Sequence, residues 1–74
     1  MAKATIRVFP AGEADWVVQE EGGRELGHYP TKASAETVGR TLARKRRTAL
    51  LVQDRDGRVK RADFRGLFSR LLGR

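Results

Sequence analysis

The sequence predicts an α+β domain, in which an antiparallel or mixed sheet of about five short strands carries one helix on one face. Three observations support this fold class. One long segment, 31–47, has helical periodicity, five short segments alternate as strands do, and turn residues separate these segments. The predicted order is β-β-β-α-β-β, followed by a short amphipathic helix at the C-terminus.

The strands are predicted from alternating side chains and from the turn residues between them. They cover residues 5–9, 15–20, 25–29, 49–53 and 58–64. Pro10 with the two residues after it should end the first strand, and Gly22-Gly23 should supply the positive φ angles of a tight turn. Segment 54–57 has the composition of a hairpin turn. We expect Val17 and Gln19 to point away from the core.

The helix is predicted to begin after Thr31, whose hydroxyl can cap the first turn, while Pro30 disfavours helical geometry in the residue before it. Helical spacing places four small or apolar residues on one stripe: Ala35, Val38, Gly39 and Leu42. Glycine inside a helix costs about 1 kcal/mol relative to alanine. We therefore expect Gly39 to pack close to a backbone or a bulky ring, with Trp16 as the candidate.

A chain of 74 residues forms one small domain, which we assign to residues 1–66, with residues 67–74 as an amphipathic tail. The candidate core consists of nine apolar residues: Ile6, Val8, Trp16, Val18, Val38, Leu42, Leu50, Val52 and Val59. The sequence contains no cysteine, no signal-peptide pattern and no apolar run of membrane-spanning length. These features predict a cytoplasmic protein.

The net charge of +7 is unevenly distributed along the chain. Residues 1–30 hold three basic and five acidic residues, whereas residues 31–74 hold thirteen basic and four acidic residues. Arginine at this density favours an anionic partner, with DNA or RNA first and an acidic membrane surface second. The alternative is that the arginines reflect the base composition of the genome and serve only solubility.

Eight basic residues of the helix and of the last hairpin are the candidate nucleic-acid-binding residues: Arg40, Arg44, Lys45, Arg47, Arg55, Arg58, Lys60 and Arg61. They would form one continuous surface if the last two strands return alongside the end of the helix. Phosphate contacts from such a surface would be strongly salt-dependent. Because only Phe9, Tyr29 and Phe64 could stack on bases, we expect binding that tolerates any sequence.

Residues suited to catalysis or metal binding are sparse. His28 is the only histidine, and as a strand residue it is more often structural than a general base. Asp54 and Asp56 offer too few oxygen ligands for a calcium loop and fit a turn better. We therefore predict no catalytic residue, no metal, no cofactor and no small-molecule substrate.

The tail carries an apolar stripe formed by Leu67, Phe68, Leu71 and Leu72. A helix this short is unstable alone in water. It must therefore pack on its own domain, on a second copy of the chain as a homodimer, or on an anionic membrane, which we expect least.

Several segments together carry a resemblance to a known family. They are the first apolar strand ending in Pro10, Trp16-Val17-Val18, Tyr29-Pro30-Thr31, the helix containing Ala35, and the closing run from Leu51 to Val59. Over residues 6–66 the chain resembles the domain of unknown function 2188 family. Lys32 departs from the glutamine expected after the threonine. The resemblance implies a small bacterial or phage-associated domain with no established activity, and no site residues.

Two functions from different classes follow. The first is a nucleic-acid-binding module that uses the basic residues. The second is a structural or protein-interaction module that dimerises or docks on a partner through its C-terminal tail.

Overall fold

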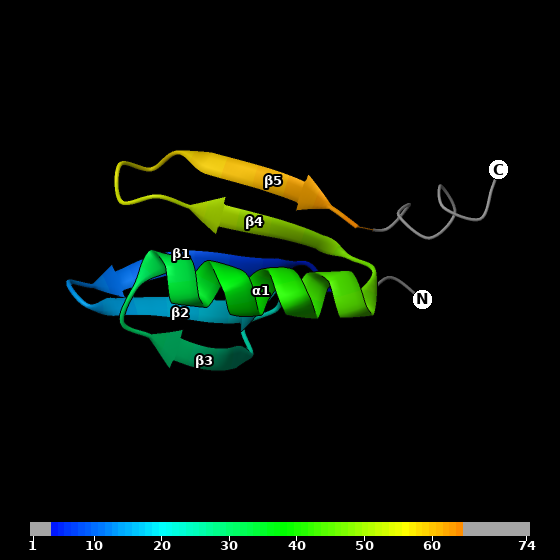
Figure 1. The fold of residues 1–74 in the computed structure, drawn as a ribbon, viewed down its shortest axis with the longest axis horizontal. Coiled ribbons are helices and arrows are strands. Elements are labelled where there is room, and N and C mark those ends of the chain that lie inside the picture. The colour runs from blue at the N-terminus through cyan, green and yellow to red at the C-terminus, as the bar shows by residue number, and fades with distance from the viewer. Residues whose placement is uncertain (1–3, 65–74) are drawn as a thin grey trace, which may run out of the picture.

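The sheet is mixed, because the helix carries the chain back across it and the next strand runs parallel to the first. The computed structural model describes residues 4–64 of the 74-residue chain. The elements are β1 (Ile6–Gly12), β2 (Asp15–Glu20), β3 (Glu25–Tyr29), α1 (Lys32–Arg46), β4 (Ala49–Gln53) and β5 (Val59–Asp63). The five-stranded sheet has the order β3-β2-β1-β4-β5, in which only β1 and β4 pair in parallel (Figure 1). The predicted α+β class and element order are confirmed; the predicted C-terminal helix lies outside the described residues.

Small residues on α1 let the helix lie close to the sheet. Ala35, Gly39 and Ala43 are its buried positions, spaced four residues apart along one stripe. A Cβ atom on Gly39 would be 2.8 Å from Val8 Cγ2 and 3.0 Å from Leu50 Cδ1. The close approach predicted for Gly39 is therefore present, but its neighbours are aliphatic side chains of β1 and β4 rather than Trp16.

The ends of α1 are fixed by local hydrogen bonds. Ser34 N donates to Thr31 Oγ1 at 3.1 Å, which confirms Thr31 as the N-cap. At the other end Arg47 adopts the left-handed conformation with a φ of 55°, and Thr48 N donates to Ala43 O at 2.9 Å. These bonds satisfy backbone groups that the helix leaves without internal partners.

Two sequence predictions about the strands are wrong. β1 does not stop at Pro10 but pairs with β2 as far as Gly12, through a register irregularity. Proline is tolerated there because β4 pairs with β1 only over Ile6–Val8, so the missing N–H breaks no bond to β4. Val59 is not a core residue: it is 57% exposed, since it lies opposite Gln53 on an edge strand, on the face without the helix.

Val17 was expected to point outward and instead is 1% exposed. Its side chain does lie on the face opposite α1, because it alternates with Trp16 and Val18 of the core. Phe9 and His28 flank it in register on the neighbouring strands and cover it. The alternation of side chains along the strand correctly predicts which face of the sheet Val17 lies on, but it does not predict that Val17 is buried.

Candidate nucleic-acid interface

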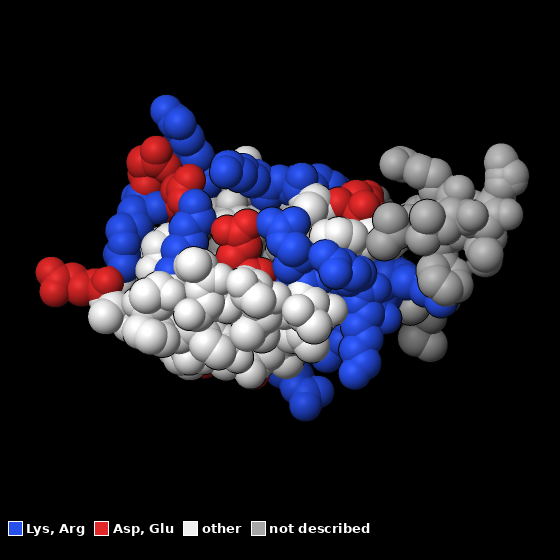
Figure 2. Space-filling model, viewed as in Figure 1, with Lys and Arg blue, Asp and Glu red and all other residues white. Residues whose placement is uncertain are grey.

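Charge is segregated over the surface of the protein. Within residues 31–64 there are ten lysines and arginines and four acidic residues. Figure 2 shows Lys and Arg side chains gathered on the β5 side of α1 and around the C-terminal end of the helix. The solvent-facing surface of α1 toward β3 is uncharged over a broad area. The positive character is therefore concentrated where α1 meets the outer hairpin.

The direction of β4 separates the predicted basic residues into groups. β4 runs back along α1, so the turn between β4 and β5 lies beside the start of the helix, where Lys32 forms an ion pair with Asp54. Arg55 and Arg58 belong to this turn. A helix of 15 residues is about 22 Å long, so the turn is far from Arg44, Lys45 and Arg47 at the other end. The eight residues do not gather into one continuous surface.

The alternation of side chains along β5 divides the predicted basic residues further. Lys60 pairs with Val52, a core residue, so its side chain is on the side of the sheet that carries α1. Arg61 pairs with Leu51 and lies on the opposite face. The two neighbouring cations of β5 therefore belong to different surfaces.

Each of the four carboxylates of residues 31–64 forms an ion pair with a basic side chain. Glu36 pairs with Arg40, one helical turn away, at 2.6 Å, and Asp56 and Asp63 pair with Arg58 and Arg61 at 3.3 Å. Lys32 forms an ion pair with Asp54. This contact lowers the pKa of the Asp54 carboxyl and raises the pKa of the Lys32 amine. Arg44, Lys45 and Lys60 form no ion pair with any residue among 4–64. Lys45 follows Arg44 by about 100° around the helix and so points to its other side.

We call the surface between α1 and β5 the basic ledge, and define it by Arg40, Arg44, Arg47 and Lys60. Arg40 and Arg44 are one turn apart on the helix edge toward β5, and Arg47 follows as the C-cap residue just beyond α1. The Arg44 guanidinium lies 5.7 Å from the centre of the Phe64 ring, just beyond β5. The half-buried Ala62 and Phe64 pack against the core and form the floor of the ledge.

Arg55 makes contacts within the protein that link two parts of the fold. Its Nη2 donates hydrogen bonds to Gly12 O at 2.7 Å and to Glu13 O at 2.6 Å, in the turn between β1 and β2. Its guanidinium also lies 5.1 Å from the centre of the Trp16 ring. These contacts tie the outer hairpin to the opposite half of the sheet. No sequence signal marks this role, because it depends on the parallel pairing of β1 with β4.

His28 lies exposed between two carboxylates near the other edge of the sheet. Its Nε2 is 2.9 Å from Glu25 Oε1 and its Nδ1 is 2.8 Å from Asp15 Oδ1. Hydrogen bonds to Glu25 first, and to Asp15 second, raise the pKa of the imidazole. Both ring nitrogens have partners, so this arrangement stabilises a cation. Residues 4–64 contain no group of three or more His, Asp or Glu side chains placed to hold a metal ion.

The four residues predicted for an interface, Leu67, Phe68, Leu71 and Leu72, lie outside the described residues. No helix in the described part of the chain is long and apolar enough to cross a membrane.

Comparison with known proteins places the chain in a family. No curated protein and no solved structure matches the chain. Residues 6–63, most of its length, match the profile of DUF2188, described as "Uncharacterized protein conserved in bacteria". The match covers every helix and strand described above. The chain is thus a member of the DUF2188 family.

Proposed function

We propose that this protein is a nucleic-acid-binding module that contacts phosphates through the basic ledge and tolerates any base sequence. The observation that carries the proposal is the position of Arg44 and Lys60. They lie on the same side of the sheet, Arg44 on α1 and Lys60 on β5, and neither forms an ion pair with a carboxylate among residues 4–64. These two charges can bind a polyanion without the loss of an existing ion pair.

The ledge suits the sugar-phosphate backbone better than base edges. Guanidinium groups bind phosphate oxygens with two parallel hydrogen bonds, and lysine adds a mobile point charge. Four contacts of this kind predict a slope of about −3.6 in log Kobs against log salt concentration for duplex DNA. Contacts to phosphates position a protein without reading sequence.

The experiment compares two variants that lose the same charge. In Arg44→Gln/Lys60→Gln the ledge loses two cations; in Arg24→Gln/Arg58→Gln two exposed turns lose two cations. Fluorescence anisotropy with a labelled 20-base-pair DNA duplex should show a loss of affinity of at least tenfold for the ledge variant and less than threefold for the control. Retained affinity in the ledge variant would contradict the proposal. An equal loss in both variants would show that only net charge matters.

We place this activity in the cytoplasm, where nucleic acid is available and where a chain without cysteine has no need of disulfides. Binding rather than catalysis is proposed because His28, the only histidine, is held between two carboxylates.

A second candidate function is self-association, favoured by the uncharged surface of α1. An open groove of about 510 Å³ is lined by Tyr29, Ala33, Ser34, Thr37 and Val38. Thr37 and Thr41 donate their hydroxyl hydrogens to the carbonyls of Ala33 and Thr37, both at 2.9 Å, which leaves their methyl groups for a partner. Light scattering should then give the mass of a dimer, and Thr37→Glu should return it to that of a monomer. A monomeric wild-type protein would contradict this candidate.

A further inference from the structure

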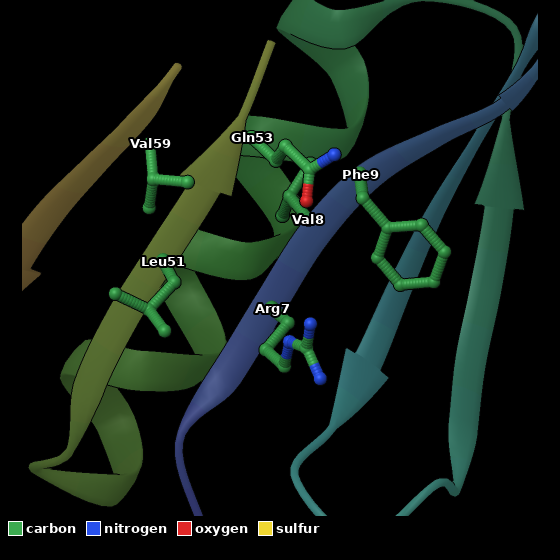
Figure 3. Close-up of a pocket in the computed structure, with 6 residues that line it drawn as sticks. All are labelled: Arg7, Val8, Phe9, Leu51, Gln53 and Val59. Carbon is green, nitrogen blue, oxygen red and sulfur yellow. The ribbon is translucent and has the colours of Figure 1, made fainter. Parts of the chain in front are cut away.

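The face of the sheet opposite α1 carries no helix among residues 4–64 (Figure 1). A hollow of about 60 Å³ lies on this face, across β1, β4 and β5. Its lining consists of Arg7, Val8, Phe9, Leu51, Gln53 and Val59 (Figure 3). We call this surface the open face. It is distinct from the basic ledge, which lies on the helix side of the sheet.

The ring of Phe9 lies flat on the open face. Figure 3 looks onto this face and shows the ring nearly face-on, extending from β1 toward β2. Phe9 is in register with Val17 of β2, which is 1% exposed although residues 4–64 place no helix on this face. One side of the ring therefore covers Val17, and the other side faces solvent. A flat outward-facing ring on a sheet is the geometry on which a nucleobase stacks.

Positive charge lies beside this ring. The Arg7 guanidinium is 6.0 Å from the centre of the Phe9 ring, and Arg7 forms no ion pair with a described residue. In register, Arg7 is next to Leu51, and Leu51 is next to Arg61. The two arginines are therefore two strand spacings apart, about 10 Å. This spacing allows one extended strand to contact both.

Negative charge limits the path that such a strand could take. Asp15 and Glu25 lie around His28 at the β3 side of the open face, and they would repel phosphates. Asp63 is the carboxylate of the β5 side, and it pairs with Arg61. The favourable path therefore runs over β1, β4 and β5. The amide of Gln53 lies along this path at the hollow and can donate to or accept from a base edge.

We propose that the open face binds single-stranded nucleic acid, with one base stacked on Phe9 and adjacent phosphates contacted by Arg7 and Arg61. The proposal rests on the proposed nucleic-acid binding and adds a preference for single strands. A duplex keeps its bases stacked inside the helix and cannot present one to Phe9, whereas its phosphates can still reach the basic ledge. Variants of the open face should therefore weaken binding of single strands, whereas variants of the basic ledge should weaken binding of duplex DNA.

The test uses fluorescein-labelled oligothymidine and a DNA duplex of equal length, with the full chain. Phe9→Leu removes the aromatic ring and keeps an apolar side chain over Val17; it should weaken oligothymidine binding at least about fivefold, since stacking of one base contributes about 1–3 kcal/mol. Duplex binding should change less than twofold. Phe9→Tyr should restore single-strand affinity.

Arg7→Gln provides a variant that does not touch the packing of Val17. It should weaken oligothymidine binding more than duplex binding and lower the salt dependence for the single strand. If Phe9→Leu and Arg7→Gln leave single-strand affinity unchanged, or weaken both substrates equally, the open face is not the site. If the wild-type protein binds the duplex through Arg44 and Lys60 while these variants have no effect, only this inference fails. If it binds neither substrate at low salt, the proposed function fails as well.

Discussion

Gly39 of α1 lies so close to Val8 of β1 that a Cβ on residue 39 would be 2.8 Å from Val8 Cγ2. Val8 is β-branched and 1% exposed, so it cannot rotate away. Gly39→Ala should therefore lower the free energy of unfolding by about 1 kcal/mol, since overpacking costs about 2 kcal/mol and the gain in helix propensity offsets about 1 kcal/mol of it. Urea denaturation followed by far-ultraviolet circular dichroism measures this change. Thr41→Ala, at an exposed position of α1, is the control, and its free energy of unfolding should stay within about 0.5 kcal/mol of wild type. If Gly39→Ala is as stable as wild type, the helix can move away from the sheet and the prediction is wrong.

Removal of the helix cap gives a second prediction. Thr31→Ala deletes the oxygen that accepts from Ser34 N at 3.1 Å and leaves that N–H without its partner. The free energy of unfolding should fall by about 1 kcal/mol. Thr31→Ser and Thr31→Asp keep an accepting oxygen and should recover most of the stability in thermal denaturation. A stability of Thr31→Ser as low as that of Thr31→Ala would contradict the capping role.

The pH dependence of His28 gives a third prediction. Because Glu25 and Asp15 raise its pKa, the stabilisation from these contacts is fully present below the usual histidine value of about 6.5 and is lost as pH rises through the raised value. An NMR titration of the His28 ring should give a pKa above 6.5, and Glu25→Gln should lower it. The stability difference between wild type and His28→Gln should shrink over the same pH range. An unchanged pKa in Glu25→Gln would contradict the assigned hydrogen bond.

Arg55 is predicted to act in stability and not in binding. Arg55→Ala removes the cation over Trp16 and the hydrogen bonds to the turn between β1 and β2. The free energy of unfolding should fall by about 1 kcal/mol, and Trp16 emission should shift to longer wavelength as water reaches the ring. Affinity for duplex DNA should fall no more than in Arg24→Gln, which removes one charge elsewhere. A selective loss of affinity would instead return Arg55 to the binding surface.

Local chemistry made the elements predictable from the sequence. Thr31 caps α1, and Gly22, Gly23 and Gly57 all adopt positive φ at turns that the sequence marked. These features depend on residues close together in the chain, so their physical cause can be read from the sequence.

Long-range pairing was not predictable in the same way. The parallel register of β1 with β4 places Leu50 beside Ile6 and creates the neighbours of Gly39, and no local signal specifies it. The direction of β4 also carries Arg55 and Arg58 to the start of α1, although few residues separate them from Arg47 in the sequence. The division of Lys60 from Arg61 follows from alternation alone and could have been read from the sequence.

Recognising the open face as a candidate site required both local sequence signals and the long-range pairing of the strands. Alternation along β1 places Arg7 and Phe9 on one side of the strand, but their importance depends on β1 being the central strand. From the sequence alone, Phe9 was no stronger a candidate for stacking than Tyr29 or Phe64. The flat position of its ring over Val17 distinguishes it.

The most direct test of nucleic-acid binding is fluorescence anisotropy of labelled single-stranded and duplex DNA and RNA, with the wild-type protein at two salt concentrations. We predict micromolar or tighter binding at low salt, weakening steeply as salt rises because phosphate contacts release counterions. Absence of binding to all four nucleic acids at low salt would contradict the account.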